Sequence, residues 1–465
     1  MIEKRQSTNS GVTSANSKLA TQPLPSLILS LAAPSVIAML INLLYNIVDR
    51  IYIGRIPDIG QIALTGVGVT FPILILISAF SQLVGSGGAP LAAIKLGQGD
   101  KDGAEKILGN ACATLVLISI GLTIVFLIFQ GPILMLFGAS EQTVVYGIEY
   151  LSIYLIGTIF VLLSMGLNQY ISCQGKSKIA MLSIVIGAII NIILDPIMIF
   201  GFSLGVKGAA IATVISQCAS TIWVVFYLSS KKSGIQLKLS NLRIQPKVLA
   251  SICALGISPF IMQFTECLIN VVFNSGLQKY GGDLYVGSMT IISSVMQFLT
   301  VPIMGFSNGV QPIISYNYGA KNFERVRKTY RVSITVCIVL AMVLCGIVML
   351  LPEVFVGIFT NNQELLELTA KMLPIFICGI GIFGIQMGCQ SAFIGLGQAK
   401  ISLFLACLRK IILLIPLALI LPHFIGVKGI YIAEPISDIT AALTAGILFM
   451  INIKKILSEE ALQKV

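Results

Sequence analysis

The chain has 465 residues, of which 56% are hydrophobic and only 11% charged, and its formal net charge is +11. Soluble domains carry about 25% charged residues, so this composition excludes a soluble globular fold for most of the chain. The positive charge does not indicate a nucleic-acid partner, because the basic residues concentrate in alternate loops between apolar segments. We therefore expect the lipid bilayer to surround most of the protein.

Apolar segments of about 20 residues, the length of a membrane-spanning helix, recur along the whole sequence. They predict an all-α integral membrane protein with twelve transmembrane helices. A polar, Ser- and Thr-rich segment over residues 1–25 is expected to be disordered, and no cleavable signal peptide is apparent. The predicted spans are residues 26–52, 62–94, 107–130, 143–171, 179–201, 208–229, 249–277, 285–316, 330–351, 366–394, 401–423 and 427–452.

The longest polar segment between spans, residues 230–248, separates the sixth span from the seventh. It predicts an N-lobe over residues 26–229 and a C-lobe over residues 249–453, followed by a cytoplasmic tail over residues 454–465. With both termini in the cytoplasm, 24 of the 30 basic residues fall on the cytoplasmic side, including Arg409 and Lys410. The positive-inside rule therefore predicts this orientation in the inner (plasma) membrane.

The two predicted lobes are similar in sequence. Residues 204–216 (LGVKGAAIATVIS) align with residues 425–437 (IGVKGIYIAEPIS) at an offset of 221. Six spans return the chain to its starting side, so the second half inserts in the same orientation as the first. Parallel repeats of this kind are a transporter architecture with the substrate path between the halves. Further matches, in the same order and at nearly the same offset, pair Pro34 with Pro259, Gly99 with Gly319, and Met165 with Met387.

The clearest polar feature inside a span is the segment from Asn191 to Pro196. A carboxylate at the centre of a membrane helix costs about 2.5–3.5 kcal/mol on insertion scales, so Asp195 is a functional candidate. Asn191 and Asp195 share one helical face, and Pro196 frees a backbone carbonyl one turn earlier. These groups could bind Na⁺ or carry a proton. The alternative is a structural pair in which Asn191 satisfies the buried carboxyl.

Other acidic residues within spans are Asp49, Glu266, Glu434 and Asp438. An ion pair with Arg50 explains the presence of Asp49 in a span as well as a functional role does. For Glu266 a functional role is favoured, whereas Glu434 and Asp438 either line a substrate cavity or bond to neighbouring helices. Methionines of the seventh and eighth spans could also line a cavity, because Met adapts to irregular ligands. Packing is the simpler explanation for them. These residues are Met262, Met289 and Met296.

Several enzyme classes are not supported. The glycine-rich segment 85–88 is not followed by a Walker lysine, and no paired-aspartate cluster for Mg²⁺ occurs. The ten cysteines lack CxxC spacing, and His423 is the only histidine, so neither a disulfide framework nor a zinc site is indicated. We expect no enzymatic activity, no cofactor other than a coupling ion, and a monomer.

The chain resembles the multidrug and toxic-compound extrusion (MATE) family, in its bacterial branch. The resemblance runs nearly end to end. The matching features are Pro34 with Asp49 and Gly54, residues 191–196, residues 205–213, and the segments GFSNGVQP at 305–312 and NYGA at 317–320.

The resemblance implies two six-helix lobes in a V-shaped arrangement and the export of cationic or amphipathic organic compounds, driven by inward H⁺ or Na⁺. Family members with an ion site in the N-lobe build it from an Asp, an Asn, a second Asp and a Thr. The matching residues of this chain are Asp49, Asn191, Asp195 and Thr213. Bending of the chain is expected at Pro34 and Pro196. A C-lobe site based on Glu266 is weakened because no acid lies between residues 371 and 393.

Two other functions remain open. A lipid-linked oligosaccharide flippase of the related superfamily would need a strongly cationic cavity, whereas the charges inside these spans are mainly acidic. A passive membrane protein would leave the buried acids unexplained.

Overall fold

The computed structural model describes residues 18–57 and 59–457. Most of the segment expected to be disordered, residues 1–17, lies outside them, as do residues 458–465 of the tail. Residues 18–25 correct that expectation, because they are ordered. Leu19 is fully buried, and its carbonyl accepts hydrogen bonds from Asn317 and Arg325. Backbone groups held this way no longer need water as a partner.

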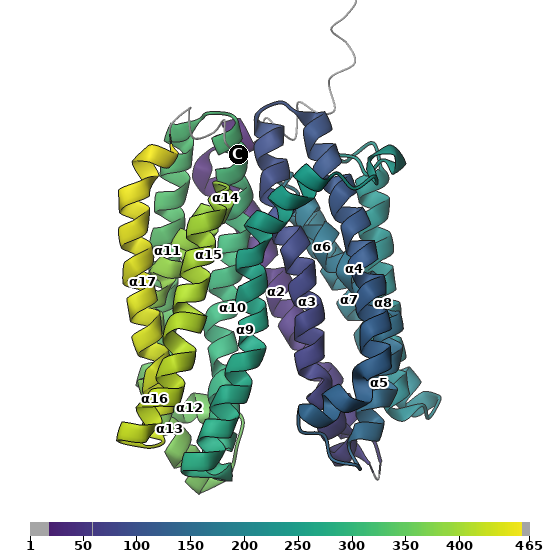
Figure 1. Ribbon diagram of the computed structural model, residues 1–465, viewed down its shortest axis with the longest axis vertical. Helices are drawn as coiled ribbons and strands as arrows, with labels where there is room; N and C mark the ends of the chain where they lie inside the picture. Colours follow the sequence, from purple (N-terminus) through teal and green to yellow (C-terminus); the bar gives the residue numbers. More distant parts are fainter. Residues whose placement is uncertain (1–17, 58, 458–465) are drawn as a thin grey trace, which may run out of the picture.

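Helices account for nearly all of the first lobe (Figure 1). They are long because their apolar sequences must satisfy every backbone polar group without water. Their bounds are α2 Leu24–Gly54, α3 Gly60–Gly97, α4 Lys101–Leu136, α5 Val144–Ile156, α6 Thr158–Ser172, α7 Ser177–Pro196, the π-helix η1 Ile197–Gly201, and α8 Gly205–Ser229.

The linker contains the short helix η2 (Leu239–Asn241), and the second lobe follows it. Ten helical segments of the described residues are long and apolar enough to cross a membrane, and two bent helix pairs bring the total to twelve. The twelve predicted spans are therefore confirmed, with ends that differ from those of the helices by up to seven residues. The elements of the second lobe are α9 Pro246–Gly281, α10 Asp283–Gly319, α11 Phe323–Leu350, α12 Pro352–Gly357, α13 Gln363–Ile377, α14 Ile380–Gly395, α15 Ala399–Cys407, the π-helix η3 Leu408–Leu414, α16 Ile415–Ile425 and α17 Lys428–Ile456.

The two bent spans show the internal repeat in three dimensions. The fourth span bends by 57° between α5 and α6, and the tenth by 45° between α13 and α14. The breaks lie at Gly157 and Gly379, which are 222 residues apart, as the sequence repeat requires. Each glycine packs directly on the last helix of its own lobe. Gly157 contacts Val214 of α8, and Gly379 contacts Pro435 of α17. The repeat therefore preserves a close helix contact that a larger side chain would obstruct.

Contacts between the lobes lie toward the end of the molecule that carries the linker, at the top of Figure 1, where helices α3 and α9 cross. There the backbones touch at small residues, as is usual between membrane helices. Gly256 of α9 lies against the backbone of Leu83, and Gly97 of α3 lies against the backbone of Tyr316. Toward the opposite end the lobes diverge (Figure 1).

The linker is held against the N-lobe. Its Lys238 pairs with the buried carboxylate of Glu105 at 2.5 Å, and this bond raises the pKa of Lys238. The backbone N–H of Gln245 donates to Asn110 Oδ1 at 2.6 Å, just before α9 begins. The linker therefore fixes where the second lobe starts relative to α4.

Gly256→Ala tests the close contact between the lobes. A β-carbon at this position would fall on the carbonyl oxygen of Leu83, and overpacking of this kind costs about 1–3 kcal/mol. We expect a lower melting temperature for the detergent-purified protein. Gly68→Ala is the matched control, because nothing lies within 4 Å of the added carbon in the same kind of helix. Equal melting temperatures for the two variants would show that the lobes do not meet as described.

Candidate functional site

The polar pair predicted in the fifth span is fully buried. Asp195 is 0% exposed and Asn191 is 1% exposed, and Asn191 Nδ2 donates to Asp195 Oδ1 at 3.2 Å. Pro196, directly after the pair, ends α7, and the chain continues as the π-helix η1. The proline lacks the N–H that would continue the α-helical pattern. The irregular backbone predicted at this position is therefore present.

Asp49 reaches the same place from α2, which packs along α7. Its carboxyl group is close enough to that of Asp195 for the two to interact electrostatically. Two carboxyl groups this close to each other disfavour double ionisation, so the pair is suited to hold one proton. The neighbouring Arg50 stacks over the ring of Phe71, with 4.4 Å from its guanidinium carbon to the ring centroid.

Three oxygens of this carboxyl pair and its amide are buried and lack a hydrogen-bond partner among the described residues: Asp49 Oδ1, Asn191 Oδ1 and Asp195 Oδ2. Buried polar atoms are normally satisfied. Unused acceptors at one point in the membrane suit a proton or a small hard cation such as Na⁺. No group of three or more His, Cys, Asp or Glu side chains that could hold a metal ion occurs in the described part of the chain.

Tyrosines complete the surroundings of the acids. Tyr45 lies one turn before Asp49 on α2 and interacts with Gln217 of α8. Tyr150 of α5 interacts with Thr213, the fourth predicted site residue, which is 9% exposed. Thr213 therefore lies beside a tyrosine that also interacts electrostatically with Asp49. Sequence reasoning missed both tyrosines because it did not consider tyrosine hydroxyls among the polar groups within the spans.

The acids of the second lobe have a different environment. Arg409 Nη2 lies 2.9 Å from Glu434 Oε1, and Arg409 Nε lies 2.7 Å from Asp438 Oδ1. Lys410 pairs with Glu266 of α9, whose side chain is half exposed. Glu434 and Asp438 are thus held in buried ion pairs, which favours the structural alternative over the cavity-lining role.

The same pairs correct the predicted charge distribution. The sequence predicts Arg409 and Lys410 on the cytoplasmic side, but both lie in η3, midway along the eleventh span, and both are buried. Acids on α9 and α17 compensate them there, so their charges do not need water. The sequence could not show this, because the partners are on other helices.

The predicted methionines lie mainly in packed regions. Met289 is 3% exposed within the core of the second lobe, and Met296 packs against that core. Met262 is partly exposed. For Met289 and Met296 the structure favours the packing explanation.

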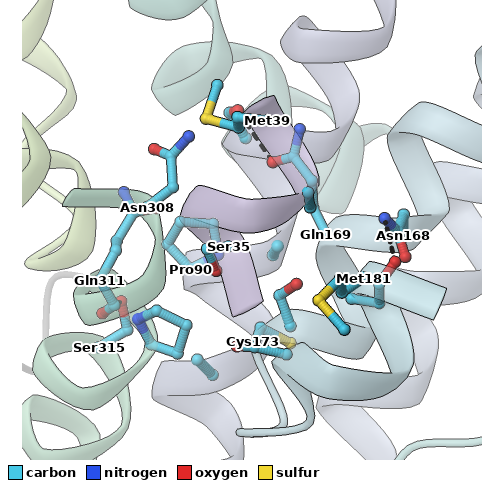
Figure 2. Close-up of a pocket in the computed structure, with 18 of the residues that line it drawn as sticks. Ser35, Met39, Pro90, Asn168, Gln169, Cys173, Met181, Asn308, Gln311 and Ser315 are labelled. Carbon is cyan, nitrogen blue, oxygen red and sulfur yellow. Dashed lines mark hydrogen bonds between the residues drawn. The ribbon is translucent and has the colours of Figure 1, made fainter. Parts of the chain in front are cut away.

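The structure contains a cavity of about 160 Å³ between the lobes, on the linker side of the carboxyl pair. Its walls are formed by α2, α3, α6, α7 and α10 (Figure 2). The predicted cavity residues do not line it. Sequence reasoning missed the amide side chains of the wall, because it considered an amide within a span only where an acid lay close to it in the sequence. These amides are Gln82, Asn168, Gln169, Asn308 and Gln311.

Known proteins resemble the chain over most of its length. The model of the MatE family matches residues 34–197 and 259–420. The multidrug export protein MepA of Staphylococcus haemolyticus (strain JCSC1435) is 27% identical over 412 residues, covering 89% of this chain and 90% of that protein. MepA of Staphylococcus aureus (strain MSSA476) is 27% identical over 414 residues, with the same shares.

Solved structures share the fold. The outward-facing conformation of a multidrug resistance MATE family transporter of the MOP superfamily is 24% identical, with a TM-score of 0.89, covering 97% of this chain and 99% of that one. MATE in the bent conformation is 23% identical, with a TM-score of 0.87, covering 96% and 98%. The expected twelve-helix, two-lobe fold is confirmed. With the family model matching both halves, the chain belongs to the MatE family of membrane transporters.

Proposed function

We propose that this protein is a secondary active antiporter that exports amphipathic organic compounds, including cations, in exchange for an inward-moving ion. The observation that carries the proposal is the pairing of Asp49 with the buried Asp195 in the N-lobe, where each carboxyl has one buried oxygen without a partner among the described residues. An acid inside the membrane marks an ion or proton path by default. The names of the MepA relatives, which are multidrug export proteins, support the substrate class.

The proposal includes an orientation. The protein lies in the plasma membrane, with the linker and both termini in the cytoplasm. The end at which the lobes touch therefore faces inward. The end at which they diverge then faces outward. A monomer with two six-helix lobes is sufficient for this arrangement, because the path lies between repeats of one chain.

Coupling requires that ion and substrate favour different states of the protein. Helix α2 is placed to connect them, because Asp49 faces α7 near one end of α2. Near the other end, Ala32 and Val36 pack on Gly309 and Gly305 of α10, in the opposite lobe. Pro34 lies between Ala32 and Val36 in the sequence, and it has no backbone N–H to donate to the helix. A change at the carboxyl pair that bends or shifts α2 would therefore alter the contact between the lobes.

The close approach of the two carboxyl groups favours H⁺ as the coupling ion. Two neighbouring carboxyls can hold one proton in common, and releasing it leaves two like charges together in a medium of low dielectric constant. Na⁺ binding would instead use both carboxylates and the Asn191 amide oxygen as ligands.

The alternative function, a lipid-linked oligosaccharide flippase, requires free cationic groups inside the cavity. Arg409 and Lys410 are the cations buried within spans of the described structure, and both are neutralised by acids of the same lobe. They do not provide a site for a pyrophosphate group. The C-lobe charges therefore support packing of η3 against α9 and α17.

The first prediction that tests the proposed function concerns Asp195→Asn and Asp49→Asn. Each variant keeps the shape of the side chain and removes the exchangeable proton. We expect H⁺-driven ethidium transport into everted membrane vesicles to be lost in both. Asp100→Asn is the matched control, because Asp100 caps α4 outside the site and Asn caps a helix equally well. Transport at the wild-type rate by either site variant would remove the proposed role.

The second prediction separates the two ions. In vesicles that contain the wild-type protein, collapse of the pH gradient with nigericin should stop ethidium transport. Replacement of Na⁺ by choline on both sides should leave it unchanged, because a shared proton is the coupling species. The reverse pattern would assign Na⁺ to the site.

The third prediction concerns the C-lobe ion pairs. Arg409→Leu leaves Glu434 and Asp438 buried without a partner, and breaking a buried pair in this way costs about 3–5 kcal/mol. We expect a lower melting temperature for the purified variant. The triple variant Arg409→Leu/Glu434→Gln/Asp438→Asn removes all three charges and should recover stability. Equal stability of the single variant and the wild type would show that the pairs are not structural.

A further inference from the structure

Residues 18–22 precede helix α2 and contact both lobes, and we refer to them as the N-terminal strap. The strap lies at the linker end of the molecule. Its Leu19 packs on Gly175, in the turn between α6 and α7. In the same turn, Gln174 Oε1 accepts a hydrogen bond from the linker N–H of Gly234 at 2.7 Å. The strap is therefore at the end where the lobes touch.

The first attachment of the strap is apolar and belongs to the N-lobe. The side chain of Leu19 is 0% exposed and packs within an apolar core that consists mainly of N-lobe side chains. Gly175 makes room for it, because a β-carbon on this glycine would lie 3.0 Å from Leu19 Cδ2. The backbone φ of Gly175 is +77°, a value that favours glycine. The turn is thus shaped to hold the leucine.

The second attachment is polar and belongs to the C-lobe. Asn317 Nδ2 of α10 and Arg325 Nε of α11 both donate to the carbonyl oxygen of Leu19, each at 3.0 Å. Arg325 Nη2 also donates to the carbonyl oxygen of Gln22 at 2.6 Å. The planar fork of a guanidinium can bind two acceptors at once, and its positive charge strengthens both bonds. The backbone of the strap is thus held by two helices of the C-lobe.

The two attachments lie beside the closest contact between the lobes. Asn317 directly follows Tyr316, whose carbonyl oxygen lies against Gly97 of α3. If α3 and α10 separated at this end, the turn that holds the Leu19 side chain would move away from α10 and α11. The strap could not follow both lobes. Either the leucine would leave its pocket or the bonds to the carbonyls would break.

We propose that the N-terminal strap holds the lobes together at the linker end, and that one of its attachments must break before they separate there. The proposal goes beyond the export function. It requires only that the lobes open in turn at each end, as in alternating access, whichever ion or compound is moved. In the orientation proposed above, the linker end faces the cytoplasm, so the strap favours the state that is open to the outside.

The polar attachment is the one that we expect to break. Water can replace the carbonyls as partners of Arg325, whose side chain is only half-buried. Withdrawal of the fully buried Leu19 would instead expose apolar surface to water. The strap therefore stays with the N-lobe during opening, and Arg325 and Asn317 move away with the C-lobe.

Hydrogen–deuterium exchange of the purified full-length protein, followed by mass spectrometry without substrate or gradient, tests this proposal. Arg325→Leu should speed exchange about tenfold at the linker-side ends of α3 and α10, residues 88–97 and 311–320. It should slow exchange where the lobes diverge, at residues 60–69 and 272–281, because opening at one end closes the other. Arg327→Leu is the matched control, since Arg327 is an exposed arginine on the same helix, and it should match the wild type.

Two further variants keep the test decisive if Arg325→Leu folds poorly. Asn317→Leu removes the other donor to Leu19 and should shift exchange in the same directions. Arg325→Lys keeps the charge but lacks the fork of donors, so its shift should be smaller. Opposite changes at the two ends of the molecule in these variants support the strap.

Two results would overturn the proposal. Exchange in the Arg325 and Asn317 variants equal to that in Arg327→Leu would show that the strap does not hold the lobes together. Faster exchange at both ends of the molecule would show that the strap stabilises the fold without favouring one state. The export function is tested separately by ethidium transport, and its failure would leave this comparison of exchange rates intact.

Discussion

A charged side chain inside a membrane span must be compensated, because the surrounding hydrocarbon cannot solvate it. The two lobes meet this requirement in different ways. In the C-lobe, Arg409 is enclosed by Glu434 and Asp438. In the N-lobe, Asp49 and Asp195 lie together without a salt bridge to either among the described residues, although the charge of the neighbouring Arg50 acts on Asp49. A bound proton is the simplest group that would compensate this pair. The first arrangement is permanent, whereas the second depends on whether the proton is bound.

This difference gives the pseudo-symmetric fold a direction. The bends at Gly157 and Gly379 show that the repeats are built alike. The exchangeable site belongs to one repeat only, however, and α2 carries its effect to α10 of the other. The close backbone contacts between the lobes then define one of two conformational states, because packed small residues either fit together or separate.

Much of the architecture could be predicted from the sequence. Apolar length predicted the twelve spans, and the offset near 221 predicted the repeat, because both are properties of neighbouring residues or of one aligned pair of segments. The pairing of Asn191 with Asp195 followed from helical spacing. The partners of Arg409 could not be predicted, because Glu434 and Asp438 lie 25 and 29 residues away on another helix. The cavity was missed for the same reason: its amides come from helices that only the tertiary structure brings together. The order of residues 18–25 depends on contacts with Asn317 and Arg325, some 300 residues away.

The central claim is that substrate binding and the proton shared by Asp49 and Asp195 are linked. Proton release from the purified protein tests it most directly, by following a pH-indicator dye in weakly buffered detergent solution as ethidium is added. The account predicts that ethidium releases protons from the wild-type protein and from Asp100→Asn, but not from Asp49→Asn or Asp195→Asn. Undiminished release from both of these site variants would contradict it.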